Sequence, residues 1–138
     1  MAEKYLRQTA PFVVPTTDGK RIVEHFGRAS TGETALSIAH MVAPPFWSEP
    51  PQRPEFDEYT LVLRGRKRVV VDGEEVLLEA GQSILVHSNV TVQYSNPFAV
   101  ELEYVSVCLP AFAPALAHRR GDDAQSDRRP PAAGGTVG

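Results

Sequence analysis

The middle of the chain, from Leu36 to Leu109, is a succession of short apolar runs separated by turn residues. Short runs of this kind, without a strong helical period, are typical of a β-sandwich or a small barrel. The Asp72-Gly73 pair predicts a hairpin with a type I′ turn, because that turn needs positive φ at both central residues. The expected strands are Leu36–Val42, Tyr59–Leu63, Val69–Val71, Val76–Leu78, Ser83–Val86, Thr91–Tyr94 and Glu101–Leu109. The sequence therefore predicts an all-β fold.

The 138 residues are enough for one hydrophobic core. We expect residues 1–30 to form an entry arm that packs on a barrel of residues 31–117. One helical turn is expected at 114–118. Residues 118–138 are charged, rich in proline, glycine and alanine, and nearly free of large apolar groups. They cannot offset their own ordering entropy, so we expect a disordered tail there.

Charge and composition exclude several classes of protein. The net charge of −3 and the lack of a basic stripe argue against nucleic-acid binding. The stretch Gly65-Arg66-Lys67-Arg68 is interpreted as a solvated strand edge. The first residues lack the apolar run of a signal peptide, and no segment is apolar enough to span a bilayer. The single cysteine, Cys108, fits a reducing compartment and is expected to be an inert core thiol. We expect a cytoplasmic protein.

The spacing of four residues resembles the two-motif signature of the cupin superfamily. Glu58 stands seven positions before Gly65, and Gly81 stands fifteen positions before Asn96. The resemblance covers roughly Leu36 to Leu109. It implies a jelly-roll fold, also called a double-stranded β-helix, like that of small bacterial RmlC-like cupins. Such a barrel holds a metal or an organic ligand inside.

The resemblance also implies that the usual metal site is missing. Gln52, Pro54 and Val92 occupy the three positions that hold histidine in metal-binding cupins, and only the carboxylate Glu58 remains. We therefore expect no metal and no other cofactor. If a metal binds, the non-standard set of His40, Gln52 and Glu58 is the alternative. One imidazole is less than transition metals generally require.

The same template indicates which side chains point into the barrel. It directs Gln52, Glu58 and Val92 inward, and steps of two along the strands add further residues. Such a pocket, with apolar walls and a few polar groups, is typical of a small-molecule site. The candidate ligand-binding residues are Gln52, His40, Tyr94, Trp47, Val92, Thr60 and His87, with Trp47 near the mouth of the barrel and His87 at its rim.

Glu58 is the candidate catalytic residue. A carboxylate inside a barrel is costly, and burial raises its pKa, so it could act as an acid or base near neutral pH. The alternative is a solvated glutamate in the acidic cluster with Glu55 and Asp57.

Three functions stay open at this point. The first is an isomerase, cyclase or lyase that acts on a small organic molecule without a metal. The second is a non-catalytic ligand-binding or sensor protein, and the third is a metal-dependent oxygenase with non-standard ligands. One fold hosts many activities, so the choice among these three functions must come from the residues of the site. We also expect a homodimer, because the strand Tyr59–Leu63 is apolar on both faces and Phe46 and Trp47 add apolar surface.

Overall fold

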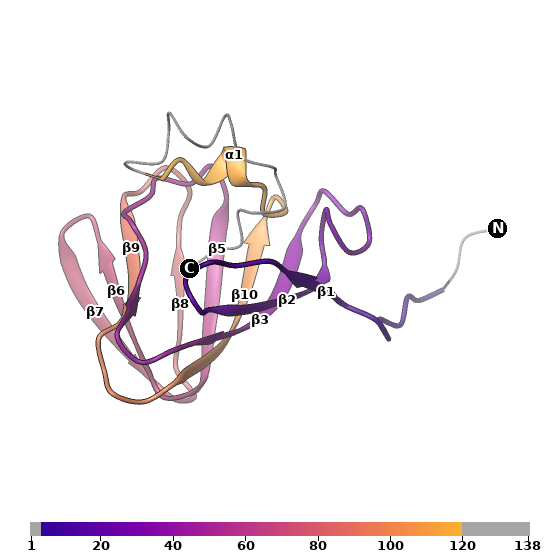
Figure 1. The fold of residues 1–138 in the computed structure, drawn as a ribbon. Coiled ribbons are helices and arrows are strands. Elements are labelled where there is room, and N and C mark those ends of the chain that lie inside the picture. Colours follow the sequence, from indigo (N-terminus) through magenta and orange to yellow (C-terminus); the bar gives the residue numbers. More distant parts are fainter. Residues whose placement is uncertain (1–3, 120–138) are drawn as a thin grey trace.

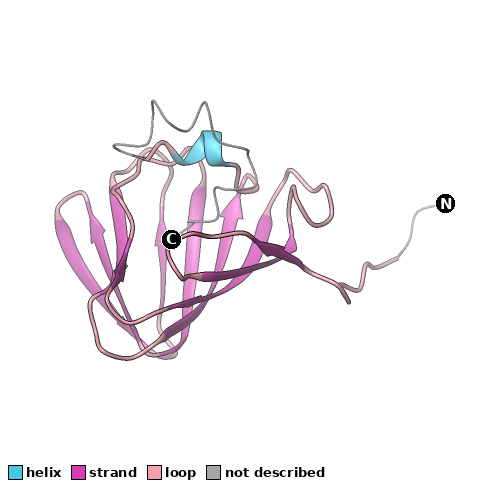
Figure 2. Cartoon of the chain, viewed as in Figure 1, coloured by secondary structure: helices cyan, strands magenta, loops and turns pink. Residues whose placement is uncertain are grey.

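The computed structural model describes residues 4–119, and antiparallel strands dominate them (Figures 1 and 2). This part of the chain contains ten strands and one short helix: β1 (Phe12–Val14), β2 (Arg21–Phe26), β3 (Ser37–Ala43), β4 (Trp47–Ser48), β5 (Asp57–Arg64), β6 (Arg66–Val71), β7 (Glu74–Glu79), β8 (Ser83–Val86), β9 (Val92–Asn96), β10 (Leu102–Leu109) and α1 (Pro114–Ala117). The prediction of an all-β jelly-roll fold is confirmed.

The strands form two sheets that enclose one interior (Figure 1). The larger sheet has the order β1-β2-β3-β10-β5-β8, and the smaller one has the order β4-β9-β6-β7. β10 lies between β3 and β5 and pairs with both over nearly its whole length. The helix α1 covers one end of the barrel, and the N-terminal residues extend away from it (Figure 2).

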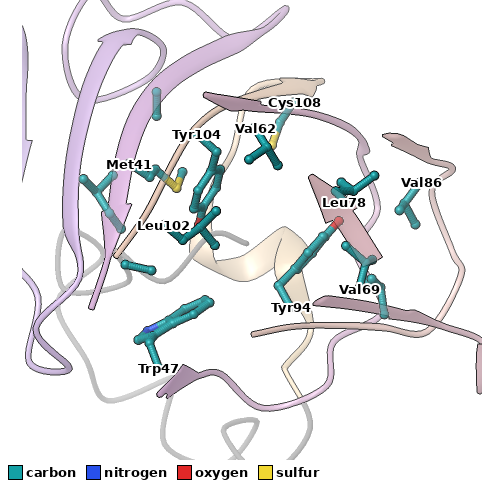
Figure 3. Close-up of a cluster of buried hydrophobic side chains, with 14 of the residues drawn as sticks. Met41, Trp47, Val62, Val69, Leu78, Val86, Tyr94, Leu102, Tyr104 and Cys108 are labelled. Carbon is teal, nitrogen blue, oxygen red and sulfur yellow. The ribbon is translucent and has the colours of Figure 1, made fainter. Parts of the chain in front are cut away.

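Alternate residues of each strand form the core between the sheets, as the pleat of a strand requires. Met41, Val62, Leu102 and Tyr104 are at most 1% exposed, and Figure 3 shows their side chains directed into the same space. The outer face of β5 is not covered within the chain. Its side chains Tyr59, Leu61 and Leu63 are 42–45% exposed.

Three residues that stood out in the sequence have clear structural roles. Asp72 and Gly73 both have positive φ, 52° and 87°, so the predicted hairpin between β6 and β7 is confirmed. Gly65 has φ of +83°, and a Cβ atom there would lie 2.3 Å from the carbonyl oxygen of Glu101. Only glycine fits such a turn.

Asn96 connects two loops at the end of β9. Its Nδ2 donates hydrogen bonds to the carbonyl oxygens of Pro44 at 3.0 Å and Val100 at 2.8 Å. Asn96 therefore has a structural role, because it holds two loops of the barrel together.

Residues at both expected domain boundaries belong to the barrel. The expected entry arm contributes β1 and β2 to the larger sheet. At the other end, His118 and Arg119 are placed, and Arg119 is buried beside Gln52, so the barrel extends past the predicted boundary. The rest of the predicted tail, residues 120–138, lies outside the described residues. None of the helices in residues 4–119 has the length and apolar character needed to cross a membrane.

Candidate functional site

Glu58 lies inside the barrel on β5, and it is only 1% exposed. The hydroxyl of Ser106, on the neighbouring strand β10, donates a hydrogen bond of 2.5 Å to its Oε2 atom. The other oxygen, Oε1, has no hydrogen-bonding partner within residues 4–119. One oxygen therefore fixes the carboxyl group while the other faces the interior. The interpretation of Glu58 as a solvated glutamate is wrong.

Burial raises the pKa of Glu58, because water no longer stabilises the ionised form. The charge of Lys67, the hydrogen bond from Ser106 and the charges of Lys20 and Arg119 act in the opposite direction. Burial and these interactions therefore shift the pKa of the carboxyl group in opposite directions. Such a balance is common for groups that exchange protons near neutral pH.

Lys67 lies on β6 opposite this carboxyl group and is 0% exposed. Its Nζ atom is 3.5 Å from the centre of the Tyr104 ring and 4.4 Å from that of Tyr94. The expectation that the basic stretch is a solvated edge is wrong at this position. Lys67 alternates with the core residue Val69, so it shares the inner face of the strand. Burial and the charge of Lys20 lower the pKa of Lys67.

Lys20 enters the interior from the turn before β2 and is 1% exposed. Its Nζ atom lies 4.2 Å from the centre of the Trp47 ring and 5.2 Å from that of Tyr104. The indole Nε1 of Trp47 donates to Oδ2 of Asp18 at 2.8 Å, which fixes the ring as a wall. Burial lowers the pKa of Lys20 to about 8.

A second acidic residue, Glu49, lies near the end of the barrel. It is 3% exposed, and its Oε2 atom is 3.7 Å from the guanidinium of Arg119. Burial raises the pKa of Glu49 to about 7, against the attraction of Lys20 and Arg119. Gln52 lies beside this pair, and its backbone exchanges two hydrogen bonds of 2.8 Å with Val92. Neither polar atom of the Gln52 side chain has a partner among the described residues.

The remaining inward candidates are Thr60 and Tyr94. The hydroxyls of both are buried and without a hydrogen-bonding partner in the described part of the chain, as is that of Tyr104. Burial raises the pKa of Tyr94 and of Tyr104, so both phenols stay protonated and can donate hydrogen bonds. Val92 is 1% exposed and supplies an apolar wall. Whether these residues bind a ligand stays a prediction.

The structure does not bring the two histidine candidates to this site. His40 lies on the outer face of β3, where its Nε2 atom is 2.7 Å from Oε2 of Glu103. The placement of His40 inside the barrel is therefore wrong. Alternation assigns it to the face opposite Met41, and Met41 is the inner residue. His87 is exposed in the loop after β8.

Sequence reasoning missed most of the interior charge. The polar residues that it did not place there are Lys20, Glu49, Lys67, Tyr104, Ser106 and Arg119. Three of them carried a signal, because Lys67 alternates with Val69, and Tyr104 and Ser106 alternate with Leu102. Lys20, Glu49 and Arg119 lie outside the long strands, where alternation gives no information.

Comparison with known proteins decides the family. The model of the family described as "Cupin domain" matches residues 39–108. The chain belongs to the cupin domain family. This cupin is 48% identical over 106 residues to a Myxococcus xanthus protein named "Endoribonuclease YbeY". That match covers 77% of this chain and 36% of the relative, so the cupin spans about a third of the length of the relative.

Two solved structures share the fold at low sequence identity. A Streptomyces PAC13 variant with uridine has a TM-score of 0.67 and 12% identity over 87% of this chain and 92% of that one. An RmlC-like cupin from Shewanella frigidimarina has a TM-score of 0.61 and 17% identity over 80% of this chain and 93% of that one. At these identities the likeness concerns the fold alone.

The residues of this cupin do not fit a transition metal. The alternative set of His40, Gln52 and Glu58 is not assembled, because His40 faces outward. The described residues contain no group of three or more histidine, cysteine, aspartate or glutamate side chains that could hold a metal ion. The buried amino groups of Lys20 and Lys67 attract Glu58 and would repel a cation beside it.

A small cavity lies beside the polar interior. Ser106, which donates to Glu58, is one of its walls, and Cys108 is another. Burial raises the pKa of the Cys108 thiol, so this group is not a thiolate near neutral pH. The cavity is mostly apolar and is lined by Val14, Ile22, Glu24, Ser37, Ala39, Met41, Ser106, Cys108 and Phe112.

Proposed function

We propose that this cupin is an enzyme of the isomerase, cyclase or lyase type, which moves a proton on a small organic molecule bound inside the barrel. Glu58 is the acid or base. The observation that carries the proposal is the state of its carboxyl group. Oε2 accepts the hydrogen bond from Ser106, and Oε1 is buried without a partner among residues 4–119. A fixed carboxyl group with one available oxygen suits proton transfer to a bound molecule.

The surroundings of Glu58 support this role. Burial raises its pKa, which makes the carboxylate a stronger base than a solvated one. The amino group of Lys67 attracts the same carboxylate. When a proton leaves a carbon next to a carbonyl group, negative charge develops on the carbonyl oxygen. An amino group that donates a hydrogen bond to this oxygen stabilises that charge in a buried site.

The aromatic residues supply the other groups that such a reaction needs. The protonated hydroxyls of Tyr94 and Tyr104 can donate hydrogen bonds to a carbonyl or hydroxyl oxygen of the substrate. The ring of Trp47 forms a wall of the same interior (Figure 3). The PAC13 structure of similar fold contains uridine, which supports an organic ligand for this cupin as well.

A non-catalytic ligand-binding cupin is the second candidate. The buried charges favour it in one respect, because the attraction between Glu58 and Lys67 and the pair of Glu49 with Arg119 would also orient a polar ligand without any proton transfer. Binding and chemistry must therefore be measured separately.

The experiment follows proton transfer without knowledge of the product. The full chain is incubated in D₂O with a panel of hydroxy aldehydes, ketoses and hydroxy acids, and the loss of carbon-bound hydrogen is followed by NMR. Glu58→Gln keeps the shape but cannot exchange a proton, so the exchange rate should fall about 10²-fold or more while binding persists. Glu79→Gln, a change at an exposed glutamate of β7, is the matched control.

The outcomes separate the candidates. If exchange and binding fall together in Glu58→Gln, the protein is a binder. If neither changes, Glu58 is not part of the site and the proposal fails.

A further inference from the structure

Residues 4–7, called the N-terminal segment below, lie outside the two sheets. All four side chains are exposed, and the segment points away from the barrel (Figure 1). Its two apolar members, Tyr5 and Leu6, are 79% and 59% exposed. Gln8 attaches the end of the segment to β2, because its Nε2 atom donates to the carbonyl oxygen of His25 at 2.7 Å. Large apolar side chains that are exposed together are typical of a surface that a partner covers.

The outer face of the larger sheet is also apolar, and it extends over the four neighbouring strands β3, β10, β5 and β8. We call the most exposed part the outer row, which consists of Tyr59, Leu61 and Leu63 of β5 and Leu85 of β8. The half-buried side chains that continue this face on β10 and β3 are Val105, Val107, Ile38 and Val42.

The polar side chains in the middle of this face already have partners. Nε2 of His40 is 2.7 Å from Oε2 of Glu103, and Nε of Arg64 donates to Oε1 of Glu103 at 3.2 Å. Burial of a charge is costly when it is left unpaired. A second copy could therefore cover this face without isolating the charge of Glu103.

The outer face offers limited area to a partner by itself. Every side chain of the outer row is less than half exposed, whereas a stable interface buries about 800 Å² on each partner. Tyr5 is the most exposed large apolar side chain within residues 4–119, and Leu6 follows it directly. The N-terminal segments of two copies would add apolar area that such a dimer needs.

The strand order brings the N-terminal segment of one copy to the outer row of another. Homodimers are usually two-fold symmetric, and sheets that pack face to face keep their strands nearly aligned. A two-fold axis along the strands, through the middle of the larger sheet between β3 and β10, sets β1 of one copy over β8 of the other and β2 over β5. Each segment leads into β1, so it starts beside the outer row of the other copy.

The charges of the two surfaces are complementary. Lys4 and Arg7 stand at the two ends of the N-terminal segment. The outer row has a carboxylate near each of its ends. Asp57 begins β5, and Glu101 accepts a hydrogen bond of 3.2 Å from Arg64 at the end of the same strand. Opposite charges at the rim of an interface favour one arrangement of the partners over others.

We infer that two copies of this cupin exchange their N-terminal segments, so that Tyr5 and Leu6 of each copy lie on the outer row of the other. The partner of this surface is therefore a second copy of the chain. The inference concerns the outside of the barrel and is independent of the proposed role of Glu58.

Removal of residues 2–7 tests the contribution of the segment. Sedimentation equilibrium on the full chain and the shortened chain should show a rise of at least about tenfold in the Kd of the dimer, because each copy loses two large apolar contacts. Tyr5→Asp keeps the length of the segment and should act in the same direction. Leu77→Asp, at an exposed leucine of β7 in the smaller sheet, is the control and should leave the Kd unchanged. A monomeric full chain, or equal Kd values with and without the segment, would overturn the inference.

Disulfide cross-linking locates the segment. A mixture of Leu6→Cys and Leu61→Cys chains should form a disulfide between these two positions, identified by mass spectrometry of the linked peptides. A mixture of Leu6→Cys and Leu77→Cys chains should not. The native Cys108 is buried, so it should not compete. A chain that carries both Leu6→Cys and Leu61→Cys distinguishes the alternative. A disulfide within one such chain would show that the segment folds back on its own barrel, and it would refute the exchange.

Discussion

The hydroxyl of Ser106 donates a hydrogen bond of 2.5 Å to Oε2 of Glu58 from a position 48 residues away in the sequence. The bond crosses from β10 to β5, two neighbouring strands of the larger sheet. It fixes the direction of the carboxyl group and partly offsets the effect of burial on its pKa. Ser106 therefore contributes both to the orientation and to the acidity of the proposed catalytic residue.

Replacement of this serine should shift the titration of Glu58. In Ser106→Ala the hydrogen bond that lowers the pKa is lost, so the pKa of Glu58 should rise further. The stability should fall by about 1–3 kcal/mol, as is usual for a bond to a charged group. NMR titration of the carboxyl carbon measures the first effect and urea unfolding the second. Ser83→Ala, at an exposed position of β8, is the control, and an unchanged Glu58 titration would contradict the prediction.

The buried charges predict that stability is lowest near pH 7 to 8. The pKa of Glu49 is raised from 4.5 to about 7, so its contribution is complete below pH 4.5 and is lost as the pH rises through 7. The pKa of Lys20 is lowered from 10.5 to about 8, so its contribution is lost as the pH falls through 8. Each shift corresponds to about 3 kcal/mol.

Urea unfolding at pH 5, 7.5 and 9.5 measures this dependence. Glu58, Lys67 and Arg119 face Lys20 and Glu49. Their charges change how far the free energy of unfolding falls between pH 7 and 8. Glu49→Gln should flatten the decline between pH 5 and 7. A maximum of stability at pH 7.5 in the unaltered protein would be the opposite of this expectation.

Two shortened chains should differ clearly in melting temperature. Removal of residues 120–138 should leave the melting temperature within a few degrees, because that sequence has few apolar side chains to bury. Removal of residues 118–138 also deletes Arg119, which pairs with Glu49 at 3.7 Å and bridges to Gln52. Loss of this pair leaves a buried carboxylate and should lower the melting temperature clearly. Equal melting temperatures of the two shortened chains would contradict the role of Arg119.

The exposed outer face of β5 predicts a homodimer. Tyr59, Leu61 and Leu63 form an apolar row, and Leu85 of β8 lies opposite Tyr59. Exposed patches of this kind are typical of protein interfaces. Light scattering at micromolar concentration should give twice the chain mass, and Leu61→Glu should give the monomer. Val100→Glu, at an exposed valine outside this row, should leave the dimer intact.

Alternation explains what could be predicted from the sequence. The strands β3 and β5 to β10 can be predicted because their inner and outer residues alternate and Asp72-Gly73 marks a hairpin, whereas the two-residue strand β4 is too short to show alternation. The same pattern cannot say which of the two faces is the inner one. The motif resemblance predicts that Glu58 points into the interior, and the structure has it there. The placement of His40 depended on alternation alone, and it was on the wrong face.

The charge of the interior is harder to predict than the strands, for a different reason. Lys67 stands between two arginines, and a run of three basic residues normally indicates solvent. Its burial depends on Tyr94, Tyr104 and Glu58, which come from three other strands. Only the assembled barrel brings these groups together, so the charge balance of the site is a property of the tertiary structure.

The central place of β10 has a consequence for the order of folding. β3 and β5 both pair with β10 and have no other strand between them, so the larger sheet stays in two parts until residues 102–109 have left the ribosome. Pairing across such long separations is slow, and open strand edges associate with other chains meanwhile. We therefore expect nascent chains that end before Leu102 to be prone to aggregation, and the barrel to close in one late step.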